Sequence, residues 1–271
     1  MSGNIFYRLD PLLICLVLTG VLFVAQELGF RVRGRERPGS DNFEKADIAL
    51  ILGAVLTLVA LLLAFTYAMS EGRFETRRQL VIEEANAIGT TYLRAKALPE
   101  PRSSEIQELL RQYTALRVEI ASTANDTPEK IREADNRSKQ LHGLIWSHAA
   151  ALARENPNPV ISIFLETLNE MIDLHSKRLA EFWNRVPFSI YLVLFAVSII
   201  ALWLVGYYFG TRRQRARILT TMVALLVASV MWLIMDLDQP VRGAIKASQQ
   251  SLIDLHEDLG QESKDAIKKS F

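Results

Sequence analysis

The chain has 271 residues, of which 50% are hydrophobic, and it carries a formal net charge of +1 at pH 7. This near balance argues against nucleic acid as a partner, because nucleic-acid-binding domains carry clustered excess lysine and arginine. The single cysteine, Cys15, excludes a disulfide within the chain. A soluble globule and a membrane protein both remain compatible with these averages, so the distribution of charge along the chain must decide between them.

Four long apolar segments stand out along the chain. A hydrocarbon core of about 30 Å requires about 20 apolar residues of helix, and each segment comes close to that length. The last three contain no Asp, Glu, Lys or Arg. The sequence therefore predicts an all-α membrane protein with four transmembrane helices in two hairpins: Leu12–Phe30, Ile48–Met69, Pro187–Phe209 and Ile218–Met235.

Basic residues crowd the two short loops at the hairpin tips. They are Arg31, Arg33, Arg35, Arg37 and Lys45 in the first loop, and Arg212, Arg213, Arg215 and Arg217 in the second. Short loops rich in Lys and Arg stay in the cytoplasm. We therefore expect a multi-pass protein of the inner (plasma) membrane, with its termini and middle region on the outer, periplasmic side. Basic residues at both ends of the middle region favour the opposite orientation.

The polar middle region, residues 70–186, has apolar residues at every third or fourth position, which is typical of helices. Pro99 with Pro101, Pro128, and the segment Asn156–Pro159 divide it into four helices. This pattern predicts a helical-bundle extramembrane domain between the two hairpins. We expect the first and last of these helices to continue spans two and three without a break.

An amphipathic helix is predicted after the fourth span, marked by Ile245, Leu252, Leu255 and Leu259. The expected domains are residues 1–69 (first transmembrane hairpin), 70–186 (helical bundle), 187–235 (second hairpin) and 236–271 (C-terminal amphipathic helix and tail).

Motifs of catalysis do not occur in the chain: it has no phosphate-binding glycine loop, no HExxH and no serine-nucleophile elbow. We expect no enzyme activity, no catalytic residue, no cofactor and no metal. His148 and His175 occupy apolar-stripe positions of the third and fourth bundle helices and are expected to meet in the core. They are either hydrogen-bonded core residues or a metal pair, although a di-iron bundle would have a Glu three residues before each histidine. A buried pair would also suit a pH sensor.

Small side chains line one face of the second span, and similar residues occur on span three (Gly206, Gly210) and span four (Thr221, Ala224, Ala228). One interpretation is close helix packing through small residues. The other is a pore enclosed by several copies of the chain, with bulkier residues forming a constriction that gates by dewetting. The predicted pore-lining residues are Gly53, Thr57, Ala60, Leu61, Ala64, Phe65, Tyr67 and Ala68.

Two segments resemble one family of membrane proteins. The first is EGRFETRRQLVIEEANAIGTTYLRAKALPEP, at Glu71–Pro101, and the second is MDLDQPVRGAIKASQQSLIDL, at Met235–Leu255. Together they resemble the bestrophin-like family of bacterial membrane proteins. The resemblance implies channel activity, because bestrophins are pentameric anion channels with a cytoplasmic helical domain. The chain departs from bestrophins in its basic hairpin tips and in lacking an acidic calcium-binding run.

Charged and polar residues near the span ends form a second group of candidates, for a charge network at a channel vestibule. Buried without partners they would be costly. We therefore expect a polar group on the helix that prolongs span two (Glu83, Glu84, Asn86 and Arg94) to bond Arg73, Arg77 or Arg78, or the Asp236–Arg242 segment. Interfacial anchoring, or pairing of the aspartates with Arg242, is the alternative for Asp236 and Asp238. The full set is Glu71, Arg73, Arg77, Arg78, Glu84, Asn86, Arg94, Asp236, Asp238 and Arg242.

These observations lead to two functional hypotheses. The first is a homo-oligomeric ion channel whose pore is lined by the second span, with the lipid bilayer, inorganic ions and other copies of the chain as partners and no nucleic acid. The alternative is a non-conducting membrane sensor or scaffold whose helical domain binds a partner or a ligand.

Overall fold

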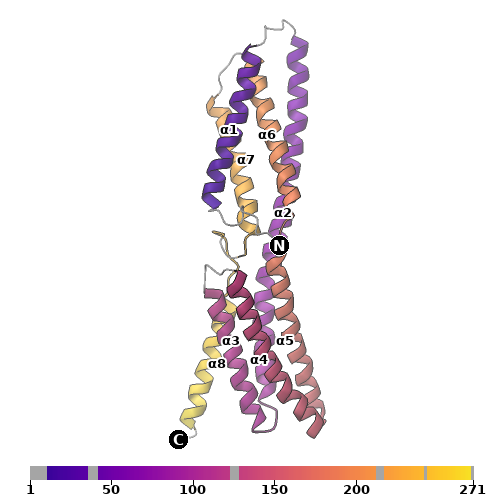
Figure 1. The fold of residues 1–271 in the computed structure, drawn as a ribbon, viewed down its shortest axis with the longest axis vertical. Coiled ribbons are helices and arrows are strands. Elements are labelled where there is room, and N and C mark those ends of the chain that lie inside the picture. The colour runs from indigo at the N-terminus through magenta and orange to yellow at the C-terminus, as the bar shows by residue number, and fades with distance from the viewer. Residues whose placement is uncertain (1–10, 36–41, 123–127, 212–216, 241–242, 270–271) are drawn as a thin grey trace. The chain divides into compact units, whose positions relative to one another are not determined.

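The computed structural model describes residues 11–35, 42–122, 128–211, 217–240 and 243–269. Within these ranges the chain is helical, with no β-strand, which confirms the predicted all-α class (Figure 1). The helices are α1 (Pro11–Arg35), α2 (Asn42–Ala95), α3 (Arg102–Ser122), α4 (Pro128–Glu155), α5 (Pro159–Trp183), α6 (Phe188–Thr211), α7 (Arg217–Asp238) and α8 (Gln250–Lys269).

The chain divides into two compact units. Unit 1 contains α1, the part of α2 up to Arg73, α6 and α7. Unit 2 contains α2 from Phe74 onward, α3, α4, α5 and α8. The four domain boundaries drawn from the sequence stay predictions, because the contacts divide the chain into two units and not into four segments.

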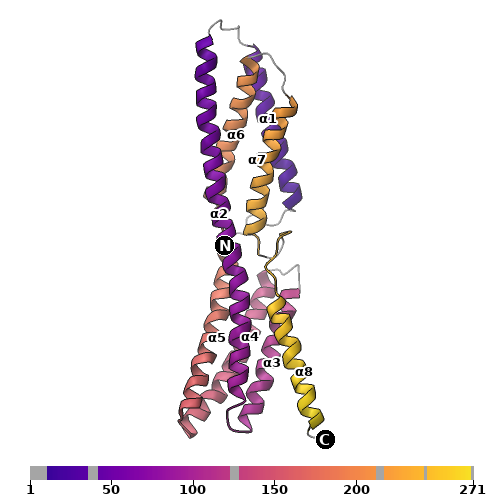
Figure 2. The same cartoon turned by 180° about the vertical axis from the view of Figure 1, so that it is seen from behind.

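Unit 1 holds the apolar helices. Its candidate membrane spans fall within Leu13–Gly34, Ala46–Ala95, Pro159–Gly210 and Arg217–Asp238, in agreement with the four predicted spans. Helix α1 packs along both α6 and α7 (Figures 1 and 2). Helix α2 contributes Val59 and Leu63 to an apolar core that also includes Leu22, Leu202 and Met231.

Glycines set the spacing between α1 and α6. A Cβ atom on Gly29 would overlap the backbone carbonyl of Trp203, and one on Gly206 would overlap the backbone carbonyl of Gln26. Only glycine allows two helix backbones to approach this closely, as in small-residue packing between membrane helices. The packing interpretation of Gly206 is therefore confirmed.

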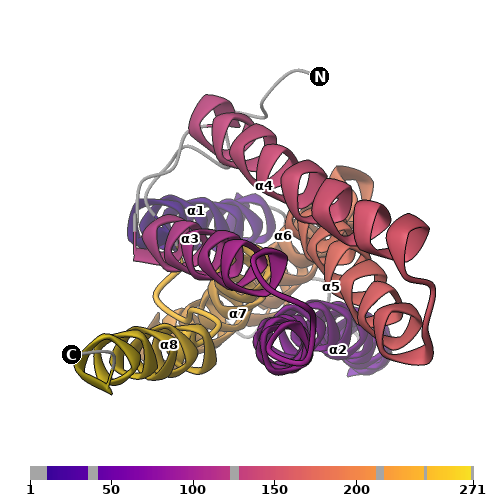
Figure 3. The same cartoon turned by 90° about the horizontal axis from the view of Figure 1, so that it is seen from below.

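Unit 2 is a bundle with a large apolar core. Helix α3 packs against α4 and α8, and α4 packs against α5 (Figure 3). The core includes Ile88 of α2, Ile106 of α3, Ile145 of α4, Phe164 of α5 and Leu252 of α8, all fully buried. The predicted C-terminal amphipathic helix thus packs through Leu252, Leu255 and Leu259. Ile245 lies before the helix begins and is exposed.

The chain runs from one unit into the other within α2 and again after α5. The helix is continuous at the first crossing and interrupted at the second. Helix α2 continues through Gly72 without interruption, as predicted. The expectation that α5 continues into span three is wrong. Helix α5 ends at Trp183, its cap residue Asn184 has an extended backbone (φ −77°, ψ 107°), and α6 starts only at Phe188. Pro187 explains the break, because proline has no N–H to donate and favours an extended conformation in the residue before it.

Candidate functional sites

The predicted pore-lining residues form an exposed stripe on α2. All eight of them (Gly53, Thr57, Ala60, Leu61, Ala64, Phe65, Tyr67 and Ala68) are exposed in the single chain. The buried face of the same part of α2 carries Leu52, Val59, Leu63 and Thr66. Helix α2 therefore packs on unit 1 through one face and presents the predicted stripe outward. Close helix packing within the chain does not account for these small residues, in contrast to Gly206, Ala224 and Ala228, which are buried.

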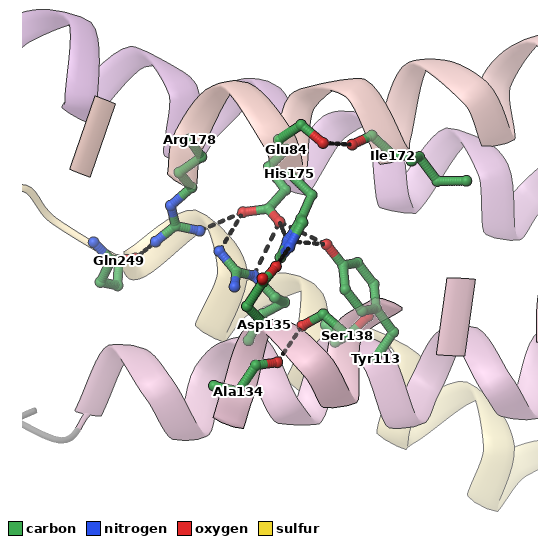
Figure 4. A network of polar contacts seen from close by, with 12 residues as sticks. Glu84, Tyr113, Ala134, Asp135, Ser138, Ile172, His175, Arg178 and Gln249 are labelled. Atoms are coloured by element: carbon green, nitrogen blue, oxygen red, sulfur yellow. Dashed lines mark hydrogen bonds and ion pairs between the residues drawn. The ribbon is translucent and has the colours of Figure 1, made fainter. Parts of the chain in front are cut away.

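The main polar site of unit 2 is centred on the carboxylate of Glu84, which is fully buried (Figure 4). Arg117 of α3 donates from Nη2 to Oε2 of this carboxylate over 3.2 Å, and Arg178 of α5 donates to the same oxygen. The Tyr113 hydroxyl donates to Oε1 over 2.8 Å. Two guanidinium groups offset the cost of burying the charge, so the carboxylate is held in its ionised form.

Arg178 extends this site to the segment before α8. Its second terminal nitrogen donates to the side-chain oxygen of Gln249, one residue before α8 begins (Figure 4). Glu84, Arg117 and Arg178 thereby join α2, α3, α5 and the start of α8 through charge-assisted hydrogen bonds, which are about twice as strong as neutral ones.

His175 brings α4 into the same network, which we call the Glu84–His175 network: Glu84, Tyr113, Arg117, Asp135, His175, Arg178 and Gln249. The Nε2 atom of His175 lies 3.1 Å from Oδ1 of Asp135 on α4. Its Nδ1 atom lies 3.3 Å from the Tyr113 hydroxyl and 3.8 Å from Oε1 of Glu84. The His175 side chain is 3% exposed, so these groups are its polar surroundings.

Three pKa shifts follow from this arrangement. Burial and the adjacent Glu84 charge raise the pKa of the Tyr113 hydroxyl well above its ordinary value. Partial burial acts to raise the pKa of Asp135, but hydrogen bonds from Lys139 and His175 outweigh it and leave this pKa lowered. Burial, aided by His175, lowers the pKa of His142 to about 4.

The predicted histidine pair has one wrong member. His175 is buried in the core as expected, but its neighbour is His142, with ring centroids 5.1 Å apart. His148 is 30% exposed and its Nδ1 lies 3.1 Å from Glu105 of α3. The error comes from the face of α4: His142 is buried one helical turn after Ser138, which is also buried, whereas His148 lies at the edge of that face. In the part of the chain that the structure describes, no group of three or more His, Cys, Asp or Glu could hold a metal ion.

The expected partners of the motif residues are also wrong. Glu84 bonds Arg117 and Arg178, and Arg78 instead forms two hydrogen bonds with Glu75, of 2.9 and 2.8 Å. Arg94 donates to the backbone carbonyl of Ile163 over 3.1 Å. The remaining predicted residues do not join the network: Glu71 and Asn86 are exposed, Arg73 is half-buried, and Arg77 is buried. A helical stripe shows which residues share a face, but not which other helix covers that face.

The two aspartates at the end of α7 are fully buried in unit 1. Asp236 accepts hydrogen bonds from the backbone N–H groups of Ala244 (2.7 Å) and Ile245 (2.9 Å). Asp238 accepts from the Val186 N–H (3.0 Å) and from the Tyr191 hydroxyl (3.3 Å). Their carboxylates therefore fix the backbone at the end of the fourth span. Arg242, their expected partner, lies outside the described residues.

A polar hollow of about 440 Å³ lies on unit 2 between α2 and α5. Its lining is mostly acidic and amide-bearing: Glu83, Asn86, Thr90, Glu166, Asn169, Glu170 and Asp173, with Lys177 as the basic member. Asn86 is the one predicted site residue that lines it.

Sequence reasoning missed five members of the network: Tyr113, Arg117, Asp135, Arg178 and Gln249. A signal for them exists in the helical stripes. Glu84 directly precedes the buried Ala85, Arg117 directly follows the buried Leu116, and Arg178 lies one turn after the buried Leu174. When two helices pack together, a charged residue next to a core position of one helix becomes buried. It then needs a residue of opposite charge next to a core position of the other helix.

Taken together, the fold is that of an all-α membrane protein with four apolar spans and an extramembrane helical bundle that is held together by a buried charge network. A family model for the bestrophin-like domain matches residues 16–252. The chain therefore belongs to the bestrophin-like family.

Solved structures with the same fold include a bacterial bestrophin homologue from Klebsiella pneumoniae. It is 15% identical, with a TM-score of 0.63, over 92% of this chain and 96% of that chain. A point mutant of the Klebsiella pneumoniae homologue is 16% identical, with a TM-score of 0.61, over 92% of this chain and 97% of that chain. At this level of identity the likeness concerns the fold alone. No curated protein sequence matches the chain.

Proposed function

We propose that the protein forms an ion-conducting pore as a homo-oligomer, with the exposed stripe of α2 lining the pore. The observation that carries the proposal is the chemistry of this stripe. Five of its eight residues are Gly, Ala or Thr. The exposed positions of the other spans are dominated by large aliphatic side chains, including Leu16, Val17, Val24, Leu192, Ile200, Ile218, Leu219 and Leu226.

The difference in side-chain size between α2 and the other spans suits two surroundings, water for α2 and lipid for the others. Large aliphatic side chains on α1, α6 and α7 suit lipid, in which they are fully solvated. Small side chains on α2 leave room for water, and the exposed Thr57 adds a hydroxyl group. A single chain with four spans cannot enclose an aqueous path, so the pore needs several copies around an axis. The bestrophin-like family adds to this argument, because its resemblance to bestrophins implies channel activity.

The bulky residues of the stripe supply the gate in this proposal. Leu61 and Phe65 are 50% and 65% exposed in the single chain, and both face the same side as Ala64 and Ala68. A ring of such side chains excludes water from a narrow pore and closes it by dewetting. Glu71, exposed one turn after Ala68, would supply charge at the entrance.

Ion flux from liposomes that contain the purified protein tests the proposal. Ala64→Trp fills the stripe and is expected to reduce flux about tenfold or more by blocking the pore. Leu226→Trp, at an exposed position of α7 with no stripe role, is the matched control and should leave flux unchanged. Absence of flux above that of empty liposomes in every salt contradicts the proposal, as does equal inhibition by the two variants.

For orientation, we propose that the basic hairpin tips face the cytoplasm and the bundle faces the outer side of the membrane. The charge rule for short loops supports this placement, whereas the resemblance to bestrophins favours a cytoplasmic bundle. A reporter enzyme that is active only outside the cytoplasm, fused after Phe271, decides: activity supports the proposed orientation and inactivity reverses it.

The alternative function is a non-conducting sensor whose bundle binds a ligand or partner. The polar hollow between α2 and α5 and the nearby exposed Leu93 and Ile163 favour it. A protein that shows no flux, but whose melting temperature rises with a polycationic probe such as spermidine, would fit this function. Glu170→Gln should then reduce the shift.

A further inference from the structure

His175 is surrounded by ionisable groups from every helix that packs around it. Helix α2 supplies Glu84, α3 supplies Tyr113 and Arg117, and α4 supplies Asp135, Lys139 and His142. Its own helix supplies Arg178, which also reaches the neutral Gln249 before α8. The protonation state of the His175 ring must therefore be compatible with all of these partners at once.

The hydrogen-bond donors and acceptors around the ring determine its protonation state. The Tyr113 hydroxyl has one hydrogen and donates it to Glu84, so its oxygen can only accept from His175. The ionised carboxylate of Asp135 can likewise only accept. The two contacts of the His175 ring, to Tyr113 at 3.3 Å and to Asp135 at 3.1 Å, are both hydrogen bonds only when both ring nitrogens carry a proton.

We propose that His175 is a proton-binding site whose charged form fastens the first half of α4 to the bundle. When the proton leaves, a neutral ring keeps one hydrogen bond. Its bare Nδ1 then faces the lone pairs of the Tyr113 oxygen, with the Glu84 carboxylate 3.8 Å away. The ring loses one hydrogen bond and gains an electrostatic repulsion, which weakens its hold on Asp135.

The two halves of α4 respond differently because they are attached differently. The second half is anchored by the buried apolar residues Ile145, Ala149 and Leu152. At the start of α4, residues 129–137 include no buried side chain, and the first buried residue is Ser138. In this stretch Asp135 reaches His175, and Arg137 forms an exposed pair with Glu119 of α3 over 3.7 Å. Loss of the proton should therefore loosen the first half of α4 and leave the second half in place.

Hydrogen exchange of the full-length protein in lipid nanodiscs tests the proposal. Amides are compared at about pH 5.5 and about pH 8.5, on either side of neutrality, after correction for intrinsic exchange rates. Protection of residues 132–139 should fall about tenfold at the higher pH, the effect of one hydrogen bond to a charged group, whereas that of residues 145–152 should not change. His142 cannot cause this fall, because its neutral ring, with a pKa of about 4, favours the fold as the pH rises.

Three variants separate the site from general effects of pH. His175→Gln and Asp135→Asn should each abolish the difference between the two pH values. His148→Gln, which removes a partly exposed histidine of α4, should preserve it. Nitrogen NMR of labelled His175 gives a direct readout: both ring nitrogens should be protonated at about pH 5.5. A neutral ring at that pH, equal exchange of 132–139 at both pH values, or loss of the response in His148→Gln would overturn the proposal.

Discussion

Two buried carboxylates, Glu84 of unit 2 and Asp236 of unit 1, are held in opposite ways. In unit 2, Glu84 is held by side chains from α3 and α5 that are distant in sequence. In unit 1, Asp236 is held by backbone N–H groups only eight and nine residues further along the chain. A carboxylate held by backbone fixes one local turn, whereas a carboxylate held by arginines on separate helices requires those helices to pack in one arrangement. The charge network therefore makes the packing of unit 2 depend on single side chains such as Glu84.

The largest effect is expected at the centre of the network. Glu84→Gln leaves Arg117 and Arg178 buried without a counter-charge, which should lower the free energy of unfolding by about 3–5 kcal/mol. Chemical denaturation in detergent measures the change. Glu75→Gln is the matched control, because its pair with Arg78 is exposed and solvent-screened, and its loss should have little effect on the free energy of unfolding. Similar losses in the two variants would remove the distinction between buried and surface pairs.

A pH effect of about 3 kcal/mol is expected from His142, because a pKa difference of one unit corresponds to about 1.4 kcal/mol. Its pKa in the fold is about 4, below the ordinary 6.5. The unfolded chain therefore binds the proton first, and His142 destabilises the fold as the pH falls from about 6.5 to about 4. His142→Leu should flatten the thermal stability over this range, whereas His256→Leu, exposed on α8, should not. An unchanged pH slope in His142→Leu would contradict the assignment.

In unit 1 the most sensitive position is a contact between helices and not a charge. Gly206→Ala places a methyl group against the backbone of α1 and should cost about 2–3 kcal/mol, because both helices must move apart. Gly20→Ala, which meets nothing within 4 Å in the chain, should stabilise by about 0.5–1 kcal/mol. Thermal melts in detergent compare the two. If both alanine variants raise the melting temperature, the backbones of α1 and α6 are not in close contact at Gly206, which contradicts this prediction.

A smaller effect is expected for the carboxylate that is held by backbone. Asp236→Asn keeps the size but replaces one acceptor oxygen with a donor NH2 group that faces the N–H of Ala244 or Ile245. Losing one such charge-assisted bond should cost about 2 kcal/mol, less than Glu84→Gln. Denaturation under the same conditions checks the order, and a larger loss for Asp236→Asn would reverse the comparison between the units.

Part of the site was predictable from the sequence. The exposed stripe on α2 follows from small residues at helical spacing, and Glu84 stands out as a charge between apolar positions. Its partners Tyr113, Arg117 and Arg178 lie 29, 33 and 94 residues away, on two other helices. Nothing in the local pattern of α2 selects them over the nearer Arg73, Arg77 and Arg78. His142 was overlooked in favour of His148 for the same reason, since both lie close to the same face of α4.

The sequence alone determined the four spans, the helical bundle and the family, because hydropathy and helical period are properties of each segment by itself. The tertiary structure decided which faces meet: the outward stripe of α2, the contact of Gly206 with α1, and the Glu84–His175 network. The break before Pro187 needed both sources. The sequence shows the proline, but only the structure shows that α5 ends before it, with an extended backbone at Asn184. Pairing between helices depends on how several separate helices pack at once, and no single segment carries that information.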